Sequence, residues 1–143
     1  MRLKDKVSII TGAGRGIGQA TALKFAREGA RVIVCDVGQD AVDETVAKVK
    51  AEGGEALGFI VDVTKRPQID AMVQATMAKY GRIDTLVNNA GIVMDAQLRK
   101  MSDAAFDRVI DVNLKGTYNC ARAVVDIMVE QGSGVILNAS SIV

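Results

Sequence analysis

The chain has 143 residues, of which 49% are hydrophobic and 24% charged, and this length and composition predict one domain with a substantial core. Its formal net charge of +1 and its lack of histidine argue against nucleic acid as a partner and exclude a Ser-His-Asp triad. No apolar run is long enough to span a bilayer and no signal peptide is recognisable, so no membrane attachment and a cytoplasmic location are expected.

Short apolar segments alternate with amphipathic ones along the whole chain. Strands are predicted at residues 7–11, 31–36, 56–61, 83–88 and 134–139, and helices at 16–27, 41–52, 68–80, 103–111 and 114–130. Pro67 suits the first turn of its helix, and glycines follow several of the helix ends. This alternation predicts an α/β fold with a parallel sheet and right-handed crossovers.

A glycine-rich segment, residues 11–18 (TGAGRGIG), joins the first predicted strand to the first helix. Such a turn brings backbone N–H groups close to a phosphate, and the start of the helix adds partial positive charge. The positions of Gly12, Gly16 and Gly18 follow the pattern Thr-Gly-x-x-x-Gly-x-Gly, which resembles the short-chain dehydrogenase/reductase family. The alternative is a tight turn without a ligand.

Polar residues gather where the predicted strands end. Asp36 ends the second strand, Asp62 the third, Asn88 and Asn89 the fourth, and Ser141 follows the fifth. In open parallel sheets, ligands bind beyond the carboxyl ends of the strands, at the switch in strand order. The sequence therefore predicts a ligand site at this edge.

Asp36 and Arg15 give opposite indications about a dinucleotide cofactor. Asp36 follows the glycine motif at the spacing of a carboxylate that accepts a hydrogen bond from the ribose 2′-hydroxyl, and it would repel a 2′-phosphate. It therefore favours NAD(H). Arg15 makes NADP(H) possible, because the resemblance implies that a basic residue there pairs with the phosphate. Each also has a plainer interpretation, as a solvated carboxylate or a solvent-facing arginine.

The resemblance implies a Rossmann-type doubly wound sheet with strand order 3-2-1-4-5. It also implies an NAD(P)-dependent oxidoreductase that moves a hydride between nicotinamide and a small carbonyl or alcohol substrate. Residues 101–103 and 111–116 are most similar to 3-oxoacyl-[acyl-carrier-protein] reductases of fatty acid biosynthesis, whose substrate is a carrier-bound acyl chain, although sugar and diol dehydrogenases share these features.

Site residues follow from the same resemblance. Those implied for the cofactor are Gly12, Arg15, Gly16, Ile17, Gly18, Asp36, Asp62, Val63, Asn89 and Gly91. Asp62 and Val63 match the adenine contact, although Asp62 also suits the start of a helix. Ser141 matches the catalytic serine. Asn113 matches an asparagine that bends a helix beside the catalytic lysine, or else it caps or joins two helices. No metal site is predicted, and Cys35 and Cys120 are expected to be buried thiols.

The family's acid and its helper, Tyr-x-x-x-Lys, are expected soon after Ser141 but are not present. Tyr80 is followed four places on by Asp84, and Tyr118 by Arg122. Residues 1–143 are thus expected to be an incomplete dinucleotide-binding domain, inactive alone. The alternative is a non-catalytic nucleotide-binding or assembly domain.

The predicted helix from Leu114 to Glu130 has apolar residues on two sides, with a narrow charged stripe between them. The core of one monomer needs only one apolar face. The other face is expected to meet a second copy in a homodimer or homotetramer, unless further parts of the protein cover it.

Overall fold

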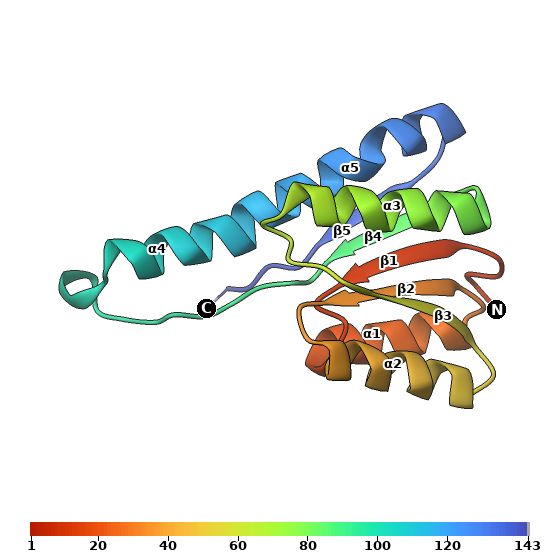
Figure 1. Ribbon diagram of the computed structural model, residues 1–143, viewed down its shortest axis with the longest axis horizontal. Helices are drawn as coiled ribbons and strands as arrows, with labels where there is room; N and C mark the ends of the chain where they lie inside the picture. The colour runs from red at the N-terminus through yellow and green to blue at the C-terminus, as the bar shows by residue number, and fades with distance from the viewer. Residues whose placement is uncertain (143) are drawn as a thin grey trace.

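The computed structural model describes residues 1–142, in which a five-stranded parallel sheet lies between two layers of helices (Figure 1). The strand order is β3-β2-β1-β4-β5, which confirms the predicted topology. The strands are β1 (Val7–Thr11), β2 (Arg31–Asp36), β3 (Glu55–Ile60), β4 (Thr85–Asn88) and β5 (Val135–Asn138).

Helices cover both faces of the sheet. The α-helices are α1 (Gly16–Arg27), α2 (Gln39–Ala51), α3 (Arg66–Tyr80), α4 (Asp103–Val109) and α5 (Gly116–Gln131), with a 3₁₀-helix η1 (Leu98–Lys100) and a π-helix η2 (Ile110–Lys115). In Figure 1, α1 and α2 lie below the sheet, and α3 and α5 lie above it. The bounds of the elements differ from the predicted ones by two residues or fewer. Within residues 1–142, no helix combines the length and hydropathy needed to cross a membrane.

Two apolar cores lie on opposite faces of the central strands. Ile9 and Ile33 pack toward α3 and α5, whereas Ile10 and Val34 pack toward α1 and α2. All four are completely buried, and each contributes roughly 1.5–3 kcal/mol by its burial. Because both faces are covered, β1 and β2 are apolar at successive positions rather than at alternate ones.

The helical path from α4 to α5 differs from the prediction. Two helices with a break at residues 112–113 were expected, but the backbone stays helical throughout, and η2 connects α4 to α5. Asn113 does not cap a helix end, because both ends of its side-chain amide bond to the main chain of Ile92, at 2.8 and 2.9 Å. The gap predicted at residues 112–113 was therefore wrong, whereas the alternative that Asn113 lies within a helix agrees with the structure.

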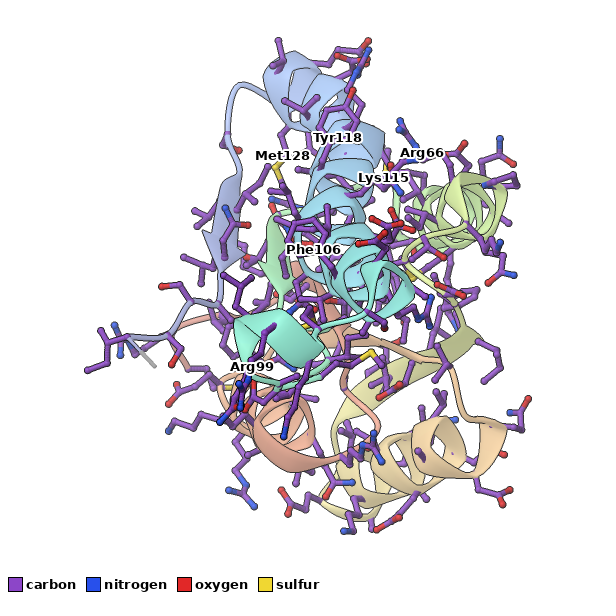
Figure 2. The ribbon with its side chains drawn as sticks, turned by 90° about the vertical axis from the view of Figure 1, so that its left-hand side faces the viewer. Arg66, Arg99, Phe106, Lys115, Tyr118 and Met128 are labelled. Atoms are coloured by element: carbon purple, nitrogen blue, oxygen red, sulfur yellow. The ribbon has the colours of Figure 1, made fainter. Side chains whose placement is uncertain are left out.

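The same path has two apolar sides, as the sequence indicated. Cys120 and Val124 are buried against the sheet. On the other side Leu114 is 63% exposed and Tyr118 is 61% exposed, and Phe106 continues this side onto α4 at 56% exposure. Phe106 and Tyr118 are both labelled in Figure 2.

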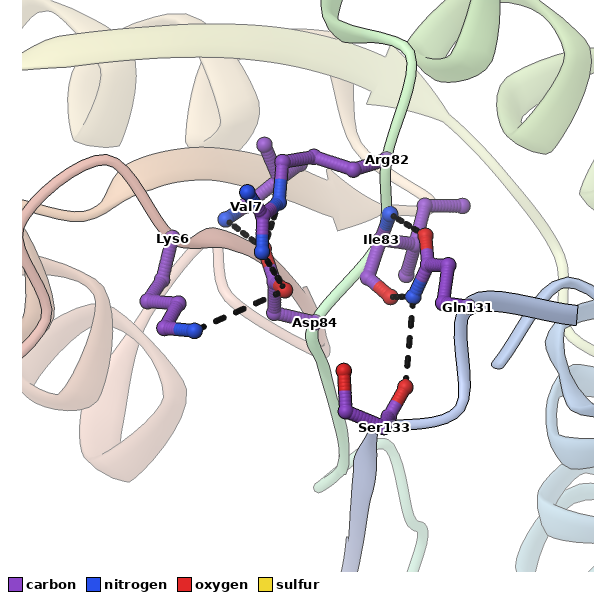
Figure 3. Close-up of polar contacts among 7 residues, drawn as sticks. All are labelled: Lys6, Val7, Arg82, Ile83, Asp84, Gln131 and Ser133. Atoms are coloured by element: carbon purple, nitrogen blue, oxygen red, sulfur yellow. Dashed lines mark hydrogen bonds and ion pairs between the residues drawn. The ribbon is translucent and has the colours of Figure 1, made fainter. Parts of the chain in front are cut away.

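The amino-terminal edge of the sheet is tied together by polar contacts (Figure 3). Asp84, only 7% exposed, accepts hydrogen bonds from the N–H of Val7 at 2.9 Å and from the Arg82 guanidinium at 2.8 and 2.6 Å. Burial alone would raise the pKa of Asp84, but these contacts lower it overall. The side chain of Gln131 bonds to both main-chain polar groups of Ile83, at 3.0 and 2.8 Å, and so joins the end of α5 to the strand edge.

Candidate functional site

A cleft of about 310 Å³ lies at the carboxyl edge of the sheet. Most of the residues predicted to hold a cofactor line it. They are Gly12, Arg15, Ile17, Asp36, Asp62, Val63, Asn89 and Gly91. These residues come from the ends of four strands, so their convergence is a result of the strand order rather than of proximity in sequence.

Gly12 and Gly18 must be glycines because the glycine-rich loop is packed closely against the residues that follow β4. A Cβ atom at Gly12 would lie 2.9 Å from the Cα of Ala90, and the φ of Gly12 is +62°. A Cβ atom at Gly18 would lie 2.7 Å from the side-chain nitrogen of Asn89 and would collide with the carbonyl of Gly12. Gly16 differs from both, because its φ is +56° but no atom of residues 1–142 lies within 4 Å of the place that a Cβ atom would take.

The start of α1 is suited to bind an anion. Its N-cap residue, Arg15, makes no side-chain capping bond, and the first turn contains no acidic residue. The first N–H groups of a helix have no partner within that helix, and the helix dipole concentrates positive charge there. Together with the exposed Arg15 side chain, this geometry fits a pyrophosphate.

Asp36 is held in a fixed orientation at the end of β2. One carboxylate oxygen accepts a hydrogen bond from the N–H of Gly14 at 2.9 Å, and the other from the N–H of Val37 at 2.7 Å. Each oxygen has a further lone pair for a ligand. A carboxylate held in this way presents negative charge to the cleft.

Asn89 and Thr11 connect the glycine-rich loop to β4. The hydroxyl of Thr11 accepts hydrogen bonds from the N–H groups of Asn89 and Ala90, at 3.0 and 2.9 Å. The side-chain nitrogen of Asn89 donates to the carbonyls of Thr11 and Gly12, at 3.2 and 3.4 Å. Asn89 therefore has a structural role, whether or not it also contacts a ribose.

Asp62 lines the cleft just beyond the end of β3. Its carboxylate accepts hydrogen bonds from the N–H and the hydroxyl of Thr64, at 2.9 and 2.7 Å. Burial alone would raise the pKa of Asp62, but the bonds from Thr64 and the positive charges of Arg108 and Lys65 lower it overall. Lys65 rather than Asp62 is the N-cap of α3, so the carboxylate orders the turn before the helix.

Some predicted residues do not line the cleft. Gly18 packs against Gly12 and Asn89, and Gly16 stands in the chain between the lining residues Arg15 and Ile17. Asn113 holds Ile92 in the loop after β4, and Ser141 is an exposed residue beyond the end of β5. These residues share the carboxyl edge with the cleft but are not part of its lining.

The cleft also contains residues that sequence reasoning missed. They are Cys35, Val37, Val61, Ile92, Arg108 and Val112. Several are neighbours of predicted residues, so the strand ends already indicated where they would lie. Arg108 had no such signal, because only the packing of α4 brings it to the cleft.

Comparison with known proteins agrees with this geometry. The family model described as short chain dehydrogenase matches residues 6–143. The chain belongs to the short-chain dehydrogenase family. It is 48% identical over 143 residues to the 3-oxoacyl-[acyl-carrier-protein] reductase FabG of Thermotoga maritima, covering 100% of this chain and 58% of that protein.

Other members of the short-chain dehydrogenase family are nearly as similar. The (2S)-[(R)-hydroxy(phenyl)methyl]succinyl-CoA dehydrogenase subunit BbsD of Thauera aromatica is 43% identical over 141 residues, covering 99% of this chain and 57% of that protein. A crystal structure of a metagenomic short-chain oxidoreductase in complex with NADP superposes with a TM-score of 0.93 and 36% identity, covering 100% of this chain and 65% of that one. The chain thus spans somewhat more than half the length of these curated relatives.

Proposed function

We propose that the complete protein is a nicotinamide-dependent oxidoreductase and that the cleft at the carboxyl edge binds its dinucleotide. The observation that carries the proposal is the charge pattern of the cleft. The cleft is lined by Arg15, at an uncapped helix start that carries positive charge, and by the negatively charged carboxylates of Asp36 and Asp62. A dinucleotide has a matching pattern, with a pyrophosphate between groups that donate hydrogen bonds.

Each part of the cleft has its own task in this proposal. The N–H groups of residues 15–18 bind the pyrophosphate, Asp36 accepts hydrogen bonds from the adenosine ribose, and Asp62 with Val63 recognises adenine. When bound, the dinucleotide would supply or accept the hydride. Asn89 and Gly91 border the path toward its nicotinamide end.

The substrate is proposed to lie near Ser141. Its hydroxyl would donate a hydrogen bond to the substrate oxygen as negative charge develops there, with Asn113 holding the neighbouring loop in place. The proton donor and its lysine are proposed to lie outside residues 1–143. Neither Tyr80 nor Tyr118 has a lysine four places later.

We propose NAD(H) as the preferred cofactor. The carboxylate of Asp36 is fixed by two N–H groups, so it cannot turn away from a 2′-phosphate without losing both bonds. The side chain of Arg15 is exposed and flexible. Its attraction for a 2′-phosphate should therefore offset the repulsion from Asp36 only in part.

Titration of the complete native protein with NADH and NADPH, followed by nicotinamide fluorescence, tests this preference. We expect NADH to bind at least about tenfold more tightly, which is about 1.4 kcal/mol. Asp36→Ala should reduce that ratio, whereas Asp70→Ala, an exposed carboxylate on α3, should not change it. A tenfold preference for NADPH in the wild type would show that Arg15 dominates, and absence of binding by either would refute the oxidoreductase proposal.

The proposed substrate is a 3-oxoacyl group carried as a thioester. Support comes from the names of two relatives, of which one refers to an acyl carrier protein and the other to CoA. Oxidation of the reduced cofactor should be faster with a carrier-bound 3-oxoacyl chain than with the same acyl group on CoA or with a sugar. Faster turnover of a sugar or diol would place the protein with the dehydrogenases of those substrates.

We further propose that the protein forms a homodimer or homotetramer through α5 and the path leading to it. Phe106, Ile110, Leu114 and Tyr118 recur every four residues and are between 39% and 63% exposed. Such spacing forms one apolar stripe along a helix.

A cytoplasmic location is also proposed, supported by the two buried, unbridged cysteines.

A further inference from the structure

We propose that Thr45, on α2, is a positioning residue for the cofactor. Its hydroxyl fixes the main chain of the glycine-rich loop, so that the N–H groups at the start of α1 are already aligned for the pyrophosphate. This inference rests on the proposed function of the cleft, but Thr45 itself does not line the cleft.

Thr45 forms its hydrogen bonds outside its own helix. It is completely buried, its hydroxyl donates to the carbonyl of Ala13 at 2.9 Å, and it accepts from the side-chain nitrogen of Gln19 at 2.9 Å. A buried threonine in a helix ordinarily bonds to a carbonyl one turn earlier, as Thr76 does with Met72 at 2.8 Å. Thr45 instead connects α2 to the loop and to α1.

All main-chain polar groups of Ala13 and Gly14 have partners from other parts of the fold. The N–H of Ala13 donates to the carbonyl of Cys35 at 3.0 Å, and the N–H of Gly14 donates to Asp36 at 2.9 Å. The carbonyl of Ala13 accepts from Thr45, and that of Gly14 accepts from Gln19 at 3.3 Å. The loop is therefore held on this side, while the N–H groups that follow, at the start of α1, point out of the helix end.

Helix α2 reaches the loop because residue 14 is glycine. A Cβ atom there would lie 2.7 Å from the Cβ of Ala41 and 2.8 Å from a carboxylate oxygen of Asp36. Ala41 precedes Thr45 by one helical turn, so both residues lie on the same face of α2. Lys48, on the next turn, donates to the side-chain oxygen of Gln19 at 3.1 Å and so orients the amide.

A loop that is held before binding loses less conformational freedom when the ligand arrives. Replacing the hydroxyl of Thr45 by a methyl group keeps its volume but leaves the carbonyl of Ala13 without this donor. Loosening of the loop should weaken binding only for ligands that contain the pyrophosphate. Ligands that bind solely at the adenine end should be unaffected.

The test uses the complete native protein and two ligands, ADP-ribose and adenine, with Kd measured by calorimetry. Thr45→Val should weaken ADP-ribose binding about five- to tenfold, as expected for one lost hydrogen bond, and change adenine binding less than about twofold. Thr45→Ser should restore wild-type affinity. Thr76→Val removes a buried hydroxyl that does not contact the loop, and it should leave both affinities unchanged.

A second variant provides an independent test in case Thr45→Val does not fold. Gln19→Met removes the donor to Gly14 and Thr45, and the same selective loss for ADP-ribose would support the inference. Unchanged ADP-ribose affinity in either folded variant, or equal losses for both ligands, would overturn it. If the wild type binds neither ligand, the proposed function itself fails, which separates the two conclusions.

Discussion

Gly18→Ala sets two physical effects against each other. Gly18 lies inside α1, and its φ is not in the left-handed region. Helix propensity alone predicts that alanine would stabilise the protein by about 1 kcal/mol. Packing predicts the opposite, because an added Cβ would lie 2.7 Å from the side-chain nitrogen of Asn89 and 2.8 Å from the carbonyl carbon of Gly12.

The packing effect should be larger. The obstructing atoms of Gly12 are backbone, so the loop must move away from α1 as a unit. Overpacking of this kind costs about 1–3 kcal/mol. The movement also disturbs the bonds from Asn89 to the carbonyls of Thr11 and Gly12, and each lost bond costs about 1 kcal/mol. With both bonds lost and after the propensity gain, the free energy of unfolding should fall by about 2–4 kcal/mol.

Urea unfolding measures this change, and fluorescence titration measures the accompanying loss of dinucleotide affinity. Gly53→Ala is the control, because Gly53 has a φ of +82°, has no atom within 4 Å of the Cβ position, and follows α2 at the opposite edge from the cleft. It should cost about 1–2 kcal/mol from backbone strain and leave affinity unchanged. A Gly18→Ala protein as stable as the wild type, with wild-type affinity, would refute the reasoning.

Three other experiments, two on variants and one on the wild type, test different parts of the structure. Asp84→Asn should lower the free energy of unfolding by about 2 kcal/mol near neutral pH. The difference should begin to shrink as pH falls below about 4 and vanish only below the lowered pKa of Asp84, because the contacts stabilise the fold only while the carboxylate is ionised. A difference that does not change with pH would contradict this. Cys35 and Cys120 should react with iodoacetamide only as fast as the protein opens, because burial raises the pKa of both thiols, that of Cys120 to about 12. Fast labelling of the native protein would disprove their burial. Leu114→Glu should convert the proposed oligomer to monomer in sedimentation experiments at micromolar concentration, whereas a monomeric wild type would exclude the interface.

The sequence by itself determined the architecture and the edge of the sheet at which the candidate cleft lies. Alternating apolar and amphipathic segments are a local property, and they were sufficient to predict a parallel sheet with helices on both faces. The polar residues Asp36, Asp62 and Asn89 were predicted to converge because strand ends in such a sheet must meet at one edge. The glycine motif and its position between β1 and α1 were likewise evident from spacing alone.

Tertiary structure decided which atoms these residues contact. Gly18 is required because Gly12 and the side chain of Asn89 pack against α1 at this position. Asn113 bonds to Ile92 instead of ending a helix. Arg108 reaches the cleft only through the packing of α4, and Thr45 supports the loop only because α2 packs against Gly14. Apart from the contact of Gly18 with Gly12, these contacts join residues far apart in the chain, and local sequence patterns do not show which distant residues meet. The partners of a buried hydroxyl or amide are therefore fixed by how the layers pack, whereas the order of the layers is fixed by the pattern of the chain.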